Sequence, residues 1–269
     1  MHPILIQLGP LPIHTYGFLI AIGFLVAVSV IRKLSARAGL DVERVADLTF
    51  WNLLIGFMGA RLLFVLTRWD YFSQNPLAIF QVWNGGLVFF GGPLAVLPFF
   101  AWYSRKFKLP VWKVGDVLVP GLAIAHAFGR LGCLAAGCCF GRPTDSDWGI
   151  KLTSDLVDVH LRGVYLHPTQ IYESVSMTLL FGLLMWTFKR KRFDGQVVLM
   201  YFMTYPLIRS VIETFRGDVI RGFIIDGLLS TSQFISILVF LGATVFFYIR
   251  LGQVGRSKKD PIMAQRSNP

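Results

Sequence analysis

The chain has 269 residues, of which 54% are hydrophobic and only 15% are charged, and its formal net charge is +11. A soluble domain of this length needs more charge to cover its surface, so the composition argues against an ordinary soluble protein and indicates a lipid environment. The excess of basic residues is typical of nucleic-acid-binding proteins and also of the cytoplasmic loops of membrane proteins. The positions of those residues distinguish the two classes.

Seven apolar runs predict the secondary structure. They cover residues 16–31, 45–66, 87–103, 114–140, 171–188, 197–212 and 229–249. Most approach the roughly 20 residues that a helix needs to cross about 30 Å of hydrocarbon. The first and sixth runs are shorter, so we expect their helices to recruit flanking polar residues. The sequence therefore predicts an all-α polytopic membrane protein with about seven transmembrane helices.

Most of the 26 Lys and Arg residues lie in alternate segments, after the first, third, fifth and seventh runs. These basic residues are Arg32, Lys33, Arg37, Arg44, Arg105, Lys106, Lys108, Lys113, Lys189, Arg190, Lys191, Arg192, Arg250, Arg256, Lys258, Lys259 and Arg266. The other loops carry few cations or balance them with Asp145, Asp147, Asp155 and Asp158. This positive-inside pattern predicts an N-terminus outside and a C-terminus in the cytoplasm, and it argues against nucleic acid as a partner.

The chain has no low-complexity linker that would divide it. We expect one transmembrane domain over residues 1–250 and a basic cytoplasmic tail over 251–269. The outside loop over 141–170 is long enough to form a small head. Residues 1–16 contain no Lys or Arg and no small-residue cleavage pattern, so we expect the first helix to be retained.

Polar residues within or beside the apolar runs mark the candidate site, because polar groups in lipid are costly. At 1.5 Å per residue, Arg130 is roughly 24 Å along an outward-running helix and Arg209 roughly 18 Å along another. The same outer level is expected to hold His14, Tyr16, Arg61, residues 85–92, His167, Gln170, Tyr172 and Glu173. Transporters usually place polar residues near the midplane of repeated halves, and the chain shows no internal repeat. The pattern instead favours a site for lipid head groups and a substrate outside the cell.

Arg130 and Arg209 are the main candidates for binding. Two guanidinium groups facing one cavity would hold a phosphate, because their planar forks bind its oxygens in pairs. Tyr205 and Glu213 share the helix face of Arg209, where Glu213 has the alternative role of neutralising Arg209. Simpler structural roles also exist for four other residues of this level. Arg61 can snorkel to the interface, Tyr16 and Tyr172 can be interfacial aromatics, and His167 can cap a helix.

Cys133, Cys138 and Cys139 are the only cysteines of the chain. The favoured interpretation is that they are small semi-apolar residues at helix contacts. The alternative is a disulfide in an oxidising exterior. On a continuous helix, positions 133 and 138 point about 500° apart, so a bridge would need a turn, which Gly137 can supply. Three thiols without a nearby histidine lack a fourth ligand, so we expect neither a metal nor another cofactor.

Five motifs resemble those of the bacterial phosphatidylglycerol–prolipoprotein diacylglyceryl transferase family. They are HTYG at 14–17, GGLVFFGG at 85–92, GRLGCLAAGCCFG at 129–141, HPTQIYE at 167–173, and YPLIR at 205–209 with Glu213 and Arg216. Each motif alone is a weak signal. Together they occur in order along nearly the whole chain, which makes the resemblance specific.

The resemblance implies a reaction. The thiol of a lipobox cysteine on an exported prolipoprotein attacks the diacylglyceryl carbon of phosphatidylglycerol, a thioether forms, and glycerol phosphate leaves. The resemblance assigns phosphatidylglycerol binding to Arg130, with Gly129 beside it, a role at the reacting phosphate to Arg209, and a role in activity to Tyr16. His14, Arg61, Gln170, Glu173, Tyr205 and Glu213 are expected to support them. The implied location is the bacterial cytoplasmic (inner) membrane, with the site facing the outer leaflet.

The chain departs from the family pattern at Phe90. Familiar members have a histidine in this glycine-flanked segment, proposed as the base, and phenylalanine cannot take a proton. The general base is therefore unassigned, with His14 a weak candidate. The favoured hypothesis remains the transferase, because the arginines and Tyr16 are retained. The alternative is a non-catalytic lipid-binding or lipid-moving protein of the same fold.

Overall fold

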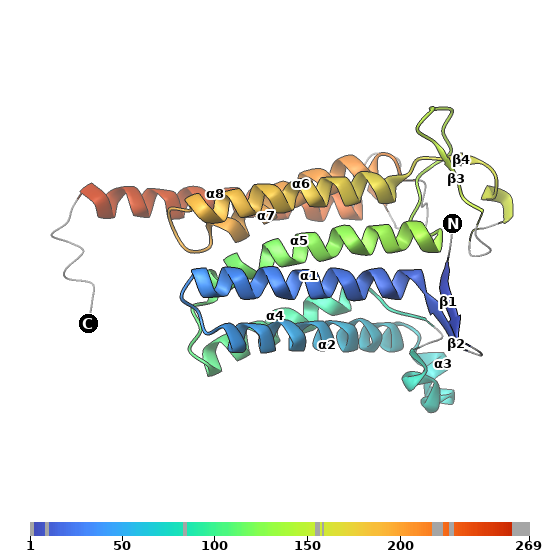
Figure 1. Ribbon diagram of the computed structural model, residues 1–269, viewed down its shortest axis with the longest axis horizontal. Coiled ribbons are helices and arrows are strands. Elements are labelled where there is room, and N and C mark those ends of the chain that lie inside the picture. Colours follow the sequence, from blue (N-terminus) through green and yellow to red (C-terminus); the bar gives the residue numbers. More distant parts are fainter. Residues whose placement is uncertain are drawn as a thin grey trace. The chain divides into compact units, whose positions relative to one another are not determined.

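The computed structural model describes residues 3–8, 11–82, 85–153, 157, 159–216, 223–225 and 229–259 (Figure 1). Each predicted apolar run coincides largely with one long helix. These helices are α1 (Thr15–Arg37), α2 (Val42–Thr67), α4 (Gly91–Lys106), α5 (Val111–Ala136), α6 (Thr169–Arg190), α7 (Gln196–Glu213) and α8 (Thr231–Lys259). The expected acidic residues Asp155 and Asp158, and residues 260–269 of the expected tail, lie outside the described residues.

Short elements connect the long helices. They are the antiparallel pairs β1 (Ile4–Leu8) with β2 (Leu11–His14), β3 (Ile150–Lys151) with β4 (Tyr165–Leu166) and β5 (Phe223–Ile225) with β6 (Leu229–Ser230), and the helices α3 (Trp69–Gln74), η1 (Pro76–Phe80) and η3 (Val159–Leu161). The protein is therefore mostly helical, as the sequence predicts.

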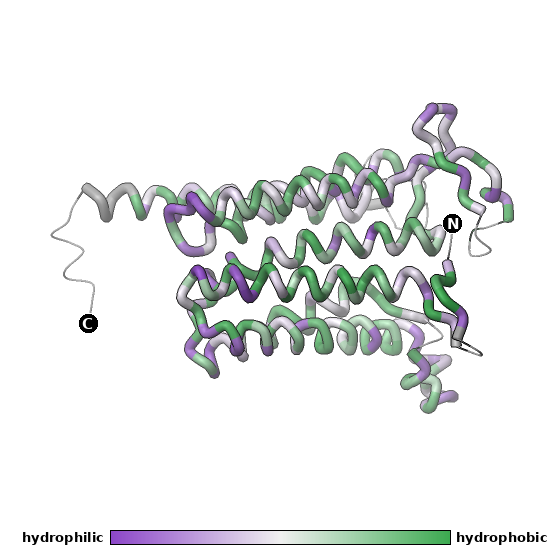
Figure 2. Tube along the Cα trace, in the orientation of Figure 1, coloured by the Kyte–Doolittle hydropathy of each residue, from purple (hydrophilic) through white to green (hydrophobic). Residues whose placement is uncertain are grey.

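Five of the described helices, α1, α2, α5, α6 and α8, are long and apolar enough to cross a membrane. Figure 2 shows that hydrophobic residues dominate along these helices. The short first run becomes the 23-residue α1 by recruiting polar residues through Arg37, as expected. The sixth run likewise gains Gln196 and Glu213 at the ends of the 18-residue α7, while α4 has only 16 residues.

The chain divides into two compact units, each of which is described by itself. The first unit comprises Met1–Val30 and Gly115–Pro269, and the second comprises Ile31–Val114. In the first unit, α7 packs along both α6 and α8 (Figure 1). Its core joins α5, α6 and α7 through Val119, Ala123, Ala127, Met177, Leu180, Leu184, Val197 and Tyr201.

A buried carboxylate on α5 organises one end of the first unit. Asp116 has no solvent exposure, and its oxygens accept hydrogen bonds from the backbone N–H groups of Gly195, Val197 and Val198 at 2.9–3.1 Å. These donors are among those that the first turn of α7 leaves without helical partners. Lys191 Nζ lies 2.8 Å from the same carboxylate. Asp116 therefore caps α7 from a different helix and fixes the turn between α6 and α7.

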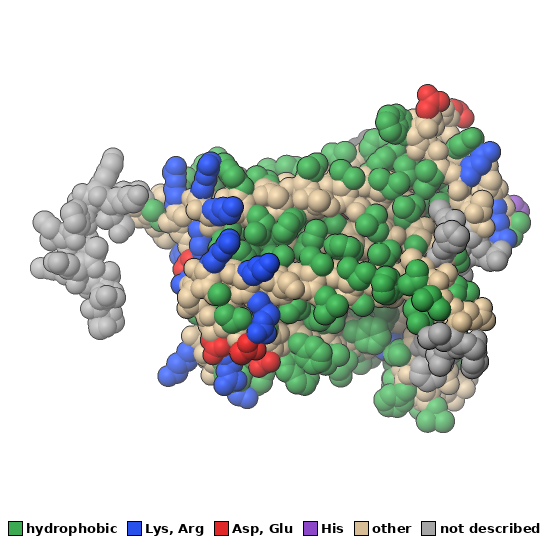
Figure 3. Space-filling view, in the orientation of Figure 1, with side chains coloured by type: hydrophobic (Ala, Val, Ile, Leu, Met, Phe, Trp, Pro, Cys, Tyr) green, Lys and Arg blue, Asp and Glu red, His purple; other side chains and the backbone are tan. Residues whose placement is uncertain are grey.

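Charged side chains lie at both ends of the first unit in Figure 3. Lys and Arg side chains gather around the turn between α6 and α7, and acidic side chains lie at the tip of the segment that contains β3 and β4. This segment has its own small core, in which Leu152 and Leu166 are fully buried beside Val157. The loop over 141–170 thus contains local structure of its own.

In the second unit, two helices approach closely at glycines. A Cβ atom added to Gly59 of α2 would lie 2.4 Å from the carbonyl oxygen of Gly91 at the start of α4, which no side chain tolerates. Small residues at such a crossing let two helix backbones come together, as is common in membrane helices. The glycine pair at 91–92 is therefore explained by helix packing.

The Asp116 cap generates a stability prediction. Asp116→Ala leaves Lys191 and the first turn of α7 without their acceptor, so the free energy of unfolding should fall by about 3–5 kcal/mol. Thermal unfolding in detergent micelles measures this as a lower transition midpoint. Asp194→Ala is the matched control. It removes the other carboxylate partner of Lys191, and the Asp194 side chain is 47% exposed. The control should cost less than about 1 kcal/mol; equal shifts in both variants would contradict the capping role.

Candidate functional site

Arg130 and Glu173 form the centre of the candidate site. Arg130 lies near the end of α5, and its Nη2 is 2.9 Å from Glu173 Oε1 in the first turns of α6. The Glu173 side chain is 1% exposed and that of Arg130 is 17% exposed. A carboxylate at this depth requires a cation, because an unpaired buried charge is far more costly than a paired one. The pair therefore ties α5 to α6 at the expected residues.

His126 completes this centre, and the sequence interpretation missed it. Its Nε2 is 3.2 Å from Arg130 Nε and 3.2 Å from Glu173 Oε1. Nε2 can accept from Arg130 when it is unprotonated or donate to Glu173 when it carries the proton, so His126 contacts both partners and hydrogen-bonds to one of them at a time. The available signal was its position four residues before Arg130, on the same face of one apolar helix.

The start of α6 is buried against α5. Gln170 and Glu173 are almost fully enclosed, and Ser174 Oγ donates to the carbonyl of Ala127 at 3.0 Å. Positions 170, 173, 174 and 177 form one helical face, which explains their shared burial. The predicted support residues Gln170 and Glu173 thus come together with Arg130.

The α7 residues approach from the other side. The Tyr205 ring stacks on Tyr201 at 5.4 Å and lies 5.7 Å from the His126 ring. One turn further on, Arg209 forms an ion pair with Glu213. Arg209 also interacts electrostatically with Glu173. Of the two candidate arginines, Arg130 therefore pairs with Glu173 and Arg209 pairs with Glu213.

Tyr16 reaches the end of α5 from the first turn of α1. A Cβ atom added to Gly132 would lie 2.9 Å from Tyr16 Cδ2, so a glycine is required at this crossing. Tyr16 is 41% exposed and interacts electrostatically with Arg130. A Cβ at Gly129 would meet no atom within 4 Å, which leaves open space beside Arg130.

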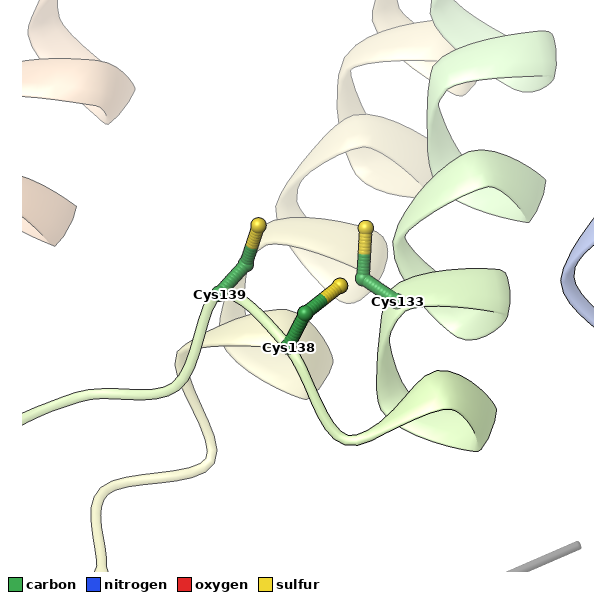
Figure 4. A group of neighbouring side chains, drawn as sticks. All are labelled: Cys133, Cys138 and Cys139. Atoms are coloured by element: carbon green, nitrogen blue, oxygen red, sulfur yellow. The ribbon is translucent and has the colours of Figure 1, made fainter. Parts of the chain in front are cut away.

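The fourth apolar run was predicted as helical through residue 140, but α5 ends at Ala136. The correction has a local cause, because Gly137 adopts φ +78° and ends the helix in a left-handed turn. Cys138 and Cys139 therefore lie in a loop beside the last turn of α5 (Figure 4). All three cysteine thiols are free, and Cys138 is exposed.

Two other predicted residues, His14 and Arg61, have surroundings of their own. His14 ends β2 and is exposed. Arg61 belongs to the second unit, where it is 8% exposed and its guanidinium donates to backbone carbonyls. The acceptors are Ala78, Ile79, Gln81, Gly85 and Gly86 at 2.5–3.3 Å. Arg61 thus holds the loop before α4.

Phe90 immediately precedes α4 and is 55% exposed, with its ring 5.9 Å from that of Phe89. An apolar, exposed side chain at this position offers no proton acceptor. Among the described residues, the titratable groups around Arg130 include His126, Glu173, Tyr16, Tyr205 and the cysteines. The cluster can bind an anion through its arginines, and its thiols and histidine can exchange protons.

Comparison with known proteins gives the family. The model of the family described as prolipoprotein diacylglyceryl transferase matches residues 3–249. A phosphatidylglycerol–prolipoprotein diacylglyceryl transferase 2 of Clostridium perfringens is 35% identical, over 93% of this chain and 95% of the relative. Enzymes of the same name from Clostridium tetani and Synechococcus elongatus are each 34% identical, over 91% and 80% of this chain and 97% and 77% of the relatives. The chain therefore belongs to the prolipoprotein diacylglyceryl transferase family.

Proposed function

We propose that this protein transfers the diacylglyceryl group of phosphatidylglycerol to the lipobox cysteine of exported prolipoproteins. The observation that carries the proposal is the ion pair of Arg130 with the buried Glu173 between α5 and α6, together with the Arg209–Glu213 pair on α7. A phosphodiester that enters this cluster meets two guanidinium groups held on separate helices. Family membership supplies the reaction class, and the relatives carry the names of its two substrates.

The reaction needs stabilisation of a leaving dianion. The thiolate sulfur forms a bond to the diacylglyceryl carbon while the carbon–oxygen bond to phosphate breaks, and glycerol phosphate takes the electron pair. We assign Arg130, with Gly129, to the lipid phosphate and Arg209 to the charge that develops on it. Tyr16 lies at the open side of the same cluster as a third catalytic residue.

The remaining site residues have positioning roles in this proposal. Glu173 and His126 hold Arg130, Glu213 holds Arg209, and Tyr205 packs between them on α7. Gln170 fixes the loop after α5. His14 lies at the end of β2 in the first unit. Arg61 holds the loop before α4 in the second unit.

We further propose seven spanning helices in the bacterial inner membrane, with the N-terminus outside, the C-terminus in the cytoplasm and the site at the outer leaflet. Support comes from the charge distribution, since Lys and Arg gather at the α6–α7 end of the first unit (Figure 3). The Arg130 cluster lies toward the other end of α5, near the β3–β4 segment. Both substrates of the proposed reaction are accessible from that side.

Arg130→Ala tests the proposed function. Loss of the phosphate-binding fork should reduce transfer by at least about 1000-fold while the protein still inserts in the membrane. The assay follows diacylglyceryl addition to a lipobox peptide in phosphatidylglycerol vesicles. Arg192→Ala is the control, since it removes an exposed arginine beyond the far end of α6 and should leave transfer unchanged. Normal transfer by Arg130→Ala would refute the phosphate-site assignment.

Arg209→Lys tests whether a positive charge at position 209 is enough for transfer without the guanidinium geometry. An ammonium group cannot reproduce the bidentate fork, so kcat should fall by roughly 100-fold or more. Glu213→Gln keeps the Arg209 fork and removes only its carboxylate partner. Its kcat should fall much less than that of Arg209→Lys. The reverse order would show that Arg209 serves chiefly as the counter-ion of Glu213.

Phe90 is the observation that favours a second candidate, a non-catalytic lipid-binding protein of the same fold. If the transferase assignment is right, a base at position 90 is dispensable, and Phe90→His should change the transfer rate by less than about tenfold. The same vesicle assay measures it. Activity that appears only in Phe90→His, and not in the native chain, would favour the second candidate.

A further inference from the structure

The three cysteines lie together, an arrangement that the sequence allowed only if Gly137 supplied a turn. Their Sγ atoms are all within 4.8 Å of one another (Figure 4). Cys133 comes from the last turns of α5, and Cys138 and Cys139 come from the loop that follows. The early end of α5 at Ala136 produces this arrangement, because it turns the chain back toward Cys133.

The loop is held in place by several independent contacts. The Cys138 N–H donates to the carbonyl of Cys133 at 3.1 Å. Gln170 Nε2 donates to the Cys138 carbonyl at 2.7 Å, and Thr169 Oγ1 donates to the Cys139 carbonyl at 2.8 Å. The two thiol-bearing loop residues are thus fixed by the start of α6.

Cys139 is also held in an unusual conformation. Its φ is +61°, in the left-handed region that residues with a Cβ rarely adopt. Such strain costs on the order of 1–3 kcal/mol and persists where the surroundings enforce it, often at functional sites. In this conformation Sγ of Cys139 lies within 4.8 Å of the other two thiols.

The spacing of the thiols fits a metal ion. Zinc–sulfur bonds are ~2.3 Å, so three thiolates around one tetrahedral Zn²⁺ have sulfur–sulfur distances of roughly 3.8 Å. The observed upper limit of 4.8 Å is within about 1 Å of this value. Thiolate ligands favour Zn²⁺ over hard cations. Among the described residues, the group offers three ligand atoms, and three protein ligands with one open position are typical of catalytic zinc sites.

The thiols lie beside the proposed phosphate site. Cys133 follows Arg130 by three residues on α5, so the two share a helix face about 4.5 Å apart along the axis. Arg130 interacts electrostatically with Cys133 and Cys139, and Tyr16 interacts with all three cysteines. The exposed Cys138 marks an approach from outside. A fourth ligand on the metal would therefore lie next to the lipid phosphate.

We propose that Cys133, Cys138 and Cys139 bind one Zn²⁺ ion as thiolates and leave its fourth position for the thiol of the lipobox cysteine. This inference rests on the proposed function and adds to it the means of activating the nucleophile. It revises the expectation that the cysteines are packing residues. It also accounts for catalysis without a base at Phe90, because a metal-bound thiol is deprotonated.

The step balances without a redox partner. The incoming thiol displaces a zinc-bound water, and its proton leaves to the solvent outside. The zinc-bound sulfur then donates its electron pair to the diacylglyceryl carbon, and the carbon–oxygen bond breaks with its electrons going to glycerol phosphate. The product is a neutral thioether, a poorer zinc ligand than the thiolate, so water can replace it.

Metal binding is tested first, without reference to activity. The purified full chain, reduced and stripped with a chelator, is titrated with Co²⁺, whose sulfur charge-transfer absorption reports thiolate ligands. We expect one equivalent to bind and Zn²⁺ to displace it. Cys133→Ser, Cys138→Ser and Cys139→Ser should each weaken Co²⁺ binding by roughly 100-fold or more. Arg209→Lys is the control, because it should lose transfer and keep the metal.

The open position is tested with two peptides. A lipobox peptide should change the Co²⁺ absorption, and the same peptide with serine in place of its cysteine should not. Free thiols without stoichiometric metal, or a protein mass lower by one disulfide in the active enzyme, would overturn the proposal. Equal changes with both peptides would overturn the substrate–thiol step.

Activity separates this inference from the proposed function. Stripped enzyme should lose transfer by at least about 100-fold and regain it with Zn²⁺. Full transfer by stripped enzyme would overturn the zinc role and leave the transferase assignment intact. Stoichiometric metal binding with no transfer in either form would instead refute the transferase assignment and leave the zinc-binding site.

Discussion

The buried carboxylate of Glu173 sets the arrangement of the site. A charge at 1% exposure between apolar helices has no water to stabilise it, so cations must lie against it. Arg130 from α5 meets this need directly, and His126 of the same helix lies 3.2 Å from the carboxylate. The pairing ties α5 to α6 and places positive charge in the cluster. The same contacts therefore neutralise the buried carboxylate and supply the positive charge that an anionic substrate needs.

The same rule separates structural charges from those available for a ligand. Asp116 is fully used by the cap of α7 and by Lys191, and Arg61 is used by the carbonyls before α4. Neither has free capacity for a substrate. Arg130 differs, because its side chain is still 17% exposed while it is paired with Glu173. A charged residue deep in an apolar helix therefore has a role, and the partners of its side chain show whether that role is structural or leaves the charge available to a ligand.

The long helices were predictable because each apolar run is nearly the length of a span and is bounded by charges or glycines. Arg130, Glu173 and Arg209 were predictable because charges within such runs are rare. His126 was missed because a histidine in an apolar helix carries a weaker signal than an arginine. The grouping of the cysteines depended on where α5 ends, and the left-handed turn at Gly137 is one of several conformations that a glycine permits.

The transferase activity can be measured with the purified protein in phosphatidylglycerol vesicles and a lipobox peptide, by following glycerol phosphate release and peptide mass together. We expect a diacylglyceryl mass gain on the peptide cysteine with one glycerol phosphate released per transfer. A folded protein that binds phosphatidylglycerol but releases no glycerol phosphate and leaves the peptide mass unchanged would contradict it.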